Sequence, residues 1–364
     1  MTALKYQIAL SMVPGIGNVN AKKLIAYCNG AEAVFNEKHP LLLKVPGIGK
    51  KVIEQLDSSK YIDQAESEIE FMDLHKIEAS FYLDSTYPKR LKHCDDGPIV
   101  LYKKGDMQLN AMRCISIVGT RKATVKGKIL CEDLIADLAI YAPTIVSGLA
   151  YGIDVVAHKS ALKNNLETIG VLASGLDQVY PRQHERIAEQ MQKKGGLVSD
   201  YRSHAKILPV HFAERNRIVA GLADLTIVIE SSLKGGSLIT AELANGYHRD
   251  VMAIPGRPSD SQSSGCNMLI KQNKAALVES AKDIADLMGW QEHEPIKGQT
   301  RLFEGLNKEE QIIAALFPPN ESIGLDELSL QAEMPISQTT AVLLSLEFKG
   351  VVKSLPGKIY HLSH

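Results

Sequence analysis

The sequence has few of the compositional features that would assign a protein to a class at once. It carries 41 Lys and Arg against 42 Asp and Glu, which gives a net charge of −1. This balance indicates no basic surface over the whole protein, so any basic surface must be local. Its five cysteines form no C-x-x-C pair and no metal-ligand spacing, which favours a reducing compartment. No apolar run approaches the roughly 18 residues that span a membrane. The first ten residues show no signal-peptide pattern, so we expect a cytoplasmic protein of two or three domains with no membrane partner.

Common nucleotide-binding and catalytic motifs are absent as well. No G-x-G-x-x-G follows the first strand pattern of the central region, and no G-x-x-x-x-G-K-[ST] occurs. There is also no G-x-S-x-G nucleophile elbow. The sequence supplies no motif for dinucleotide, ATP or acyl-transfer chemistry, and we expect no cofactor, no metal and no catalytic residue.

The most informative stretch is 212–242. An Arg-Asn-Arg segment at 215–217 precedes an apolar, β-branched run at 225–229, which predicts a strand buried on both faces of a parallel sheet. Lys-Gly-Gly-Ser at 234–237 then leads into a helical pattern at 238–248. A strand, a glycine turn and a helix N-terminus together form an anion site, because free N–H groups and the helix dipole point out of the turn. We expect the arginines to add positive charge to this rim, which predicts phosphate binding.

Strand and helix patterns alternate through the central region. The predicted strands are 114–118, 144–147, 168–173, 197–199, 225–229 and 251–254, and the predicted helices are 125–141, 153–163, 184–194, 238–248 and 281–288. This alternation predicts an α/β fold with an extended Rossmann-like, doubly wound, mainly parallel sheet. Two short strand patterns at 81–83 and 99–102 are assigned to its edge, so we place this domain at 71–290.

Polar and glycine-containing loops follow four of these strands. They are Gly119-Thr120-Arg121, Ser147-Gly148, Ser174-Gly175 and Lys234-Gly235-Gly236-Ser237. Ligands of such sheets bind beyond the carboxyl ends of the strands. We therefore expect these loops, which are far apart in the sequence, to converge on one edge of the sheet.

The first 70 residues contain an internal repeat. Val-Pro-Gly-Ile-Gly occurs at 13–17 and again at 45–49, each time before a helical pattern. This arrangement resembles the helix-hairpin-helix module, whose exposed N–H groups hold a DNA phosphate without reading sequence. The alternative is a packing unit inside a small helical bundle, so DNA contact by this domain stays open.

The C-terminal region carries a second small pattern. Residues 291–304 are polar and predict a linker. From 305 to 364, three helix patterns and a hairpin resemble a winged helix. The third helix has no basic residue before Lys349, which favours a protein-contact or regulatory role over DNA reading.

Six segments in this order resemble the DNA-processing protein A (DprA/Smf) family. They are I-V-G-T-R at 117–121, V-S-G-L-A-Y-G-I-D at 146–154, V-L-A-S-G-L-D at 171–177, R-N-R-I-V-A-G at 215–221, G-S-L-I-T-A at 236–241 and G-C-N-M-L-I at 265–270. The resemblance covers the whole central domain. Two departures from the family pattern are Ala213, where a proline is common, and His184, where an asparagine is usual.

The resemblance implies a single-stranded DNA-binding protein. Members form a homodimer through the Rossmann-like domain and load the RecA recombinase onto incoming single strands in natural transformation, with single-strand-binding protein as a further candidate partner. Carried over onto matching positions, the implied contact residues are Arg121, Ser147, Gly148, Phe212, Arg215, Asn216, Arg217, Gly235, Gly236, Ser237 and Lys271. Aromatic residues make up only 5% of the chain, so few bases can stack and phosphate contacts dominate.

Two other hypotheses remain open at this point. The glycine loop with Glu242 is similar to that of nucleoside-monophosphate phosphoribohydrolases, in which Arg217 would hold the phosphate and Glu242 would act on the ribose. In a third hypothesis the chain is a scaffold whose winged helix recruits a partner. A structural ion pair of Arg215 or Arg217 with Asp224 or Glu230 is the alternative to phosphate binding by these arginines.

Overall fold

The structure is a computed structural model that describes residues 2–56, 59–290, 306–317, 322–349, 351–355 and 357–362. The chain divides into two compact units, Met1–Gln291 and Glu292–His364, and each is described by itself. The predicted linker at 291–304 lies outside the described residues. Among the residues that the structure describes, no helix combines the length and the apolar character needed to span a bilayer.

The first unit is organised around one sheet in the order β1-β2-β6-β5-β4-β3-β7-β8-β9. Its strands are β1 (Glu78–Phe81), β2 (Val100–Lys104), β3 (Cys114–Val118), β4 (Thr144–Gly148), β5 (Thr168–Val171), β6 (Gly195–Ser199), β7 (Leu225–Val228), β8 (Asp250–Ala253) and β9 (Ala276–Leu277). All pairings from β6 to β9 are parallel, whereas β1 and β2 form an antiparallel edge on β6. The predicted mainly parallel, doubly wound sheet is therefore confirmed.

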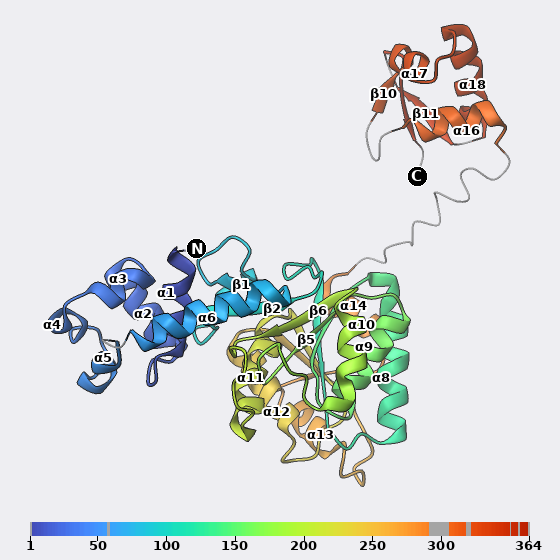
Figure 1. Cartoon of the computed structure of the whole chain (residues 1–364). Coiled ribbons are helices and arrows are strands. Elements are labelled where there is room, and N and C mark those ends of the chain that lie inside the picture. Colours follow the sequence, from blue (N-terminus) through green and yellow to red (C-terminus); the bar gives the residue numbers. More distant parts are fainter. Residues whose placement is uncertain are drawn as a thin grey trace. The chain divides into compact units, whose positions relative to one another are not determined.

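Helices cover both faces of this sheet (Figure 1). They are α7 (Lys89–Lys92), α8 (Val125–Leu138), η1 (Ala139–Tyr141), α9 (Ile153–Lys163), η2 (Arg182–His184), α10 (Glu185–Met191), α11 (Pro209–Gly221), α12 (Gly236–Gly246), α13 (Ser264–Lys271) and α14 (Ala281–Met288). Along β3, Ile115 and Ile117 pack in the cluster formed with α8, α9 and α14, while Cys114 and Val118 pack in the cluster formed with α11 to α13. This alternation follows from the two-residue period of a strand buried on both sides.

Among the helices that were not predicted from the sequence, two carry motifs of the central region. The stretch 209–221, which carries the Arg-Asn-Arg segment, forms α11, and α13 contains the whole G-C-N-M-L-I motif at 265–270. The helices that were predicted for the central region are present, with ends shifted by a few residues. For example, α12 begins at Gly236 rather than at 238. The earlier start brings Gly236 into the first turn of the helix, beside the predicted anion site.

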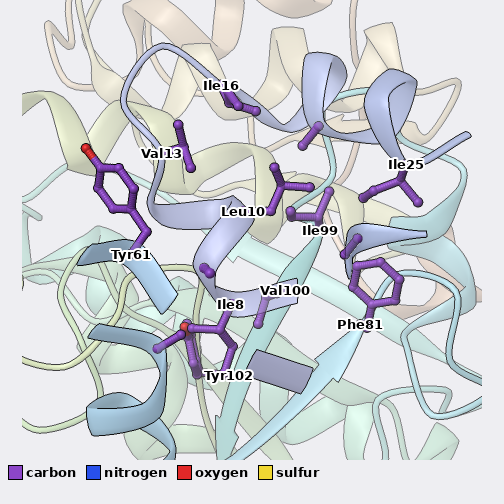
Figure 2. Close-up of a cluster of buried hydrophobic side chains, with 14 of the residues drawn as sticks. Ile8, Leu10, Val13, Ile16, Ile25, Tyr61, Phe81, Ile99, Val100 and Tyr102 are labelled. Carbon is purple, nitrogen blue, oxygen red and sulfur yellow. The ribbon is translucent and has the colours of Figure 1, made fainter. Parts of the chain in front are cut away.

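The N-terminal helices share their core with the antiparallel edge of the sheet. They are α1 (Thr2–Met12), α2 (Asn18–Cys28), α3 (Ala31–Asn36), α4 (His39–Leu42), α5 (Lys50–Leu56) and α6 (Lys60–His75). Figure 2 shows Ile8 and Leu10 of α1 beside Ile99, Val100 and Tyr102. Each fully buried aliphatic side chain of this kind contributes about 1.5–3 kcal/mol. The N-terminal helices and the sheet therefore belong to one compact unit.

Each Pro-Gly-Ile-Gly segment packs against the helix that follows the other copy. A Cβ on Gly15 would lie 3.2 Å from Val52, and a Cβ on Gly47 would lie 3.1 Å from Asn20, the residue of the first copy that corresponds to Val52 in the second. The first copy also docks on the central unit, because the Asn18 side-chain oxygen accepts from the backbone N–H of Ile99 at 3.0 Å. Packing thus occupies part of the first hairpin, and DNA contact by the repeat stays a prediction.

The second unit contains the predicted three helices and hairpin. These are α16 (Lys308–Ala315), α17 (Leu325–Gln331) and α18 (Ile336–Phe348), with a sheet of β10 (Ser322–Gly324), β12 (Ile359–Leu362) and β11 (Val352–Leu355) in that order. Its own core includes Ile313, Leu328, Leu343 and Leu346. Strand β10 is an addition to the predicted pattern.

One polar residue in the central core, His158, is held neutral. The ring donates from Nε2 to the carbonyl of Gly148 at 2.6 Å, and Nδ1 lies 2.7 Å from the Thr168 hydroxyl. Burial lowers the pKa of His158 from 6.5 to about 4. Its role is therefore structural.

This depressed pKa predicts an acid-sensitive contribution to stability. Since the folded-state pKa lies below the unfolded value, the contribution is present above pH 6.5 and is lost as the pH falls toward about 4. The expected loss is about 3 kcal/mol. Urea unfolding followed by fluorescence of Trp290, which packs against Tyr141 in the first unit, measures it. His158→Gln, which does not titrate, should show a shallower pH dependence; an equally steep one contradicts the assignment.

Candidate functional site

A pocket opens where the strand order changes direction. Strand β4 pairs with one side of β3, and β7 pairs with the opposite side of β3. The connections after β3 and β7 therefore run in opposite directions, and a crevice forms between the carboxyl ends of these two strands. The pocket there has a volume of about 380 Å³. Most of the predicted contact residues line it: Arg121, Gly148, Phe212, Arg215, Asn216, Gly235, Gly236 and Ser237. The expected convergence is confirmed for three of the four loops, whereas Ser174-Gly175, which follows β5, lies outside the pocket lining.

Hydrogen bonds between the loops fix the rim of the pocket. The N–H of Thr120 donates to the carbonyl of Glu230 at 2.8 Å. The Glu230 carboxylate accepts from the N–H of Thr124 at 2.9 Å and from its hydroxyl at 2.5 Å. Glu230 therefore anchors the start of α8. Asp224 pairs with Arg90 at 2.6 Å. Neither Glu230 nor Asp224 therefore forms the ion pair with Arg215 or Arg217 that was the alternative to phosphate binding.

The N-terminus of α12 supplies the predicted anion-binding backbone. Gly235 is its N-cap, and no side chain of the described residues caps the first turn. The Ser237 hydroxyl donates to the Ser231 hydroxyl at 2.9 Å, so its oxygen stays available as an acceptor while the backbone faces the pocket. Nothing lies within 4 Å of a Cβ placed on Gly236. The free N–H groups and the positive end of the helix dipole thus meet open space.

Arg215 is a buried cation at the base of this pocket. Its residue is 4% exposed, and Nη1 donates to the carbonyl of Val171 at 3.0 Å. Its Nε donates no hydrogen bond within the part of the chain that the structure describes. Burial lowers the pKa of Arg215, and the nearby Asp154 carboxylate acts in the opposite direction. Arg215 is therefore a charged donor with hydrogen-bonding capacity left over.

Gly148 makes room for this buried charge. A Cβ on Gly148 would lie 1.8 Å from Nη1 of Arg215 and 2.3 Å from Oδ2 of Asp154. Asp154 is itself buried, which raises its pKa, while Arg215 lowers it. The carboxylate balances part of the charge of Arg215, and any larger residue at 148 would displace one of the two groups.

Arg121 and Phe212 form the outer part of the pocket. The exposed Arg121 guanidinium lies over the Phe212 ring at 5.0 Å from its centroid. Such a contact restrains the flexible arginine side chain while its guanidinium stays largely hydrated. The pocket therefore combines one exposed cation, one buried cation and a helix N-terminus.

Three predicted contact residues lie elsewhere. The Ser147 hydroxyl is buried and donates to the carbonyl of Ile117 at 2.6 Å, and Lys271 is the exposed last residue of α13, outside the pocket lining. Arg217 donates to Asp96 O at 2.8 Å and pairs with the Asp200 carboxylate. It lines a second pocket of about 460 Å³ together with Asn18. In a helix, two residues correspond to about 200° of rotation, so Arg215 and Arg217 face opposite sides of α11.

Asp200, the partner of Arg217, was not predicted from the sequence. Asp200 directly follows β6, so it belongs to the same carboxyl edge as the predicted loops. Its position after a strand was the available signal.

This fold and this pocket define a Rossmann-like protein that has a polar pocket lined by Arg121 and Arg215 at the carboxyl edge of its sheet, lacks the dinucleotide glycine motif and carries a small C-terminal domain of three helices and a hairpin. The chain belongs to the DNA recombination-mediator protein A family, whose model matches residues 78–289, more than half of its length. A second model, the DprA winged helix domain, matches residues 303–358. The resemblance noted from the sequence and the predicted winged helix are both confirmed.

Relatives from several bacteria support this membership. The chain is 30% identical to Protein Smf of Synechocystis over 393 residues, which cover 98% of each chain. It is 39% identical to the DNA processing protein DprA of Streptococcus pneumoniae over 223 residues, covering 61% of this chain and 77% of the relative.

Solved structures give the same result. The X-ray structure of DNA processing protein A from S. pneumoniae superposes with a TM-score of 0.67 at 33% identity, covering 78% of this chain and 97% of that one. DNA processing protein A from Helicobacter pylori, described for its single-stranded DNA binding mode, superposes with a TM-score of 0.53 at 28% identity and covers 58% of this chain and 95% of that one.

Two glycines of the pocket should respond to alanine in opposite ways. Gly148→Ala should lower the free energy of unfolding by about 2–3 kcal/mol, because its Cβ collides with a buried charged pair. Gly236→Ala meets open space in the first turn of α12 and should raise it by about 0.5 kcal/mol. Urea unfolding of both variants, followed by Trp290 fluorescence, tests this. Equal stabilities would contradict the described packing around Gly148.

Arg217→Ala should lower the free energy of unfolding by about 3 kcal/mol, because it leaves the largely buried Asp200 without its cation. Burial raises the pKa of Asp200 and Arg217 lowers it, so removal of Arg217 also raises this pKa further. The double variant Arg217→Ala with Asp200→Asn should recover part of the loss, since no buried charge is left unpaired. A single variant as stable as the parent protein would show that the pair is unimportant.

Proposed function

We propose that this protein binds single-stranded DNA, without catalysing a reaction, and mediates recombination. The observation that carries the proposal lies in one pocket: the buried Arg215 stands beside the N-terminus of α12, and within the described parts of the chain neither the Nε donor nor the first turn of α12 has a side-chain partner. Both features attract phosphate oxygens. The single-stranded DNA binding mode described for the H. pylori structure supports the choice of ligand.

Phosphate contacts explain how a chain of net charge −1 binds a polyanion. The positive groups, Arg121, Arg215 and the α12 dipole, are gathered in one crevice rather than spread over the surface. Each neutralised phosphate releases counterions, so affinity falls with salt, with a slope of about −0.7 per phosphate for single strands.

We further propose that the protein acts as a homodimer through its Rossmann-like domain and loads the RecA recombinase onto single strands that enter the cell in natural transformation, with single-strand-binding protein as a second candidate partner. These parts rest on membership of the recombination-mediator family. Within the described residues, the exposed Leu277 of the edge strand β9 is a candidate for the contact between subunits. A cytoplasmic location follows from these partners.

A nucleotide-hydrolysing function is not favoured. Glu242, the acid that such chemistry would use, is exposed and pairs with Lys274 at 3.0 Å instead of lining the pocket. Arg217, the residue assigned to the phosphate in that hypothesis, lies on the other side of α11. Incubation with nucleoside monophosphates, with release of free base as the readout, separates the two functions.

Arg121→Ala should weaken binding of an oligothymidine at least tenfold and make the salt slope shallower by about 0.7, because one phosphate contact is lost. Fluorescence anisotropy at a series of salt concentrations measures both quantities. Lys163→Ala is the matched control, since Lys163 is an exposed cation at the far end of α9. An Arg121 variant with parental affinity and slope would refute the proposed site.

A further inference from the structure

Three aromatic side chains reach the edge of the sheet from three separate segments. Tyr151 follows β4, Tyr180 follows β5 and Phe212 lies on α11, which follows β6. Only Phe212 lines the pocket, whereas Tyr180 is 51% exposed and Tyr151 is 45% exposed. Aromatic residues make up only 5% of the chain, so three rings at the same edge of the sheet are a notable concentration.

The rings and Arg121 form a continuous series of contacts. Arg121 lies over Phe212, and Phe212 meets Tyr180 in an edge-to-face arrangement with centroids 5.6 Å apart at 62°. The series therefore begins at the mouth of the pocket and ends on an exposed ring. The open face of that ring is free to receive another flat group.

The surroundings of Tyr180 suit a nucleic acid strand. No hydrogen bond holds the Tyr180 hydroxyl among the residues that the structure describes, and the contact of its ring with Phe212 leaves the residue 51% exposed. By contrast, the Tyr151 hydroxyl donates to Gln183 at 2.8 Å and its ring contacts His184, which fixes its orientation. Arg182 and Arg186, both exposed, follow Tyr180 closely in the sequence. Exposed rings between exposed cations are typical of surfaces that bind single strands.

We propose that Tyr180 is a base-stacking platform that continues the binding site beyond the pocket. A strand whose phosphate is held by Arg121 and Arg215 passes along Phe212 and stacks the base of an adjoining nucleotide on the open face of Tyr180. This assignment rests on the proposed binding of single-stranded DNA. It requires no particular base, because every base offers a flat face to the ring.

Binding of oligothymidine to Tyr180→Ala, Tyr180→Phe and Tyr27→Ala tests the assignment. Tyr180→Ala should bind about tenfold more weakly, within the range expected for one stacked base. Its salt slope should stay at the parental value, because stacking releases no counterions. Tyr180→Phe keeps the ring and should bind within about twofold of the parent. Tyr27 is equally exposed, at 50%, but lies on α2, so its variant should bind as the parent does.

An oligonucleotide with abasic positions separates stacking from other effects. On this ligand, Tyr180→Ala and the parent protein should bind equally, since no base is left to stack. If Tyr180→Ala binds oligothymidine with the affinity of the parent protein, the assignment of Tyr180 as a stacking platform is wrong. If Arg121→Ala still loses affinity in that case, the proposed binding of single-stranded DNA stands without the platform. Equal losses in Tyr180→Phe and Tyr180→Ala also overturn stacking, because they assign the contact to the hydroxyl. If neither the Tyr180 nor the Arg121 variant loses affinity, the proposed function itself fails.

Discussion

The burial of the Arg215 guanidinium is the constraint on which the rest of the site depends. Removing such a group from water costs several kcal/mol unless acceptors and opposite charge replace the water. The carbonyl of Val171 and the nearby Asp154 supply part of this compensation, and the described residues offer no acceptor to Nε. In the proposed complex, a phosphate oxygen in the pocket would provide a further acceptor and negative charge. Binding of DNA would thus offset a cost that the free protein already bears.

The two arginines of the Arg-Asn-Arg segment have different tasks because α11 is a helix. Arg215 faces the ligand pocket, whereas Arg217 faces Asp200 and the backbone of Asp96. The second pocket, which Arg217 lines, is also bordered by the first Pro-Gly-Ile-Gly hairpin. One helix therefore supports the anion site on one side and the packing of the N-terminal helices on the other. The shared hydrophobic core of these helices and the sheet makes the same connection.

The sheet and the position of the pocket could be predicted from the sequence, but the side-chain directions could not. Strands such as β3 are apolar throughout, and topology alone brings the carboxyl ends of parallel strands to one edge. The stretch of α11 is harder to predict, since four polar residues stand together at 214–217 and the buried positions gather near its end. A signal was present: Arg215 precedes Ile218 and Val219 by three and four residues, which places it on the buried face of a helix. Without the helix, residues 215 and 217 cannot be assigned to opposite sides.

The depth of Arg215 favours a single strand over a duplex as the ligand. A phosphate that reaches a guanidinium with 4% exposure must enter the crevice between β3 and β7, and its sugar and neighbouring nucleotides must follow the loops at the rim. A single strand has the torsional freedom to bend in this way and to turn its bases outward onto aromatic rings. In a duplex, the same movement breaks base pairs and stacking, at a cost of a few kcal/mol for each base that leaves the stack. Under the proposed function, a buried cation at the base of this crevice would discriminate between the two forms of DNA through their stiffness, with no contact that reads a base.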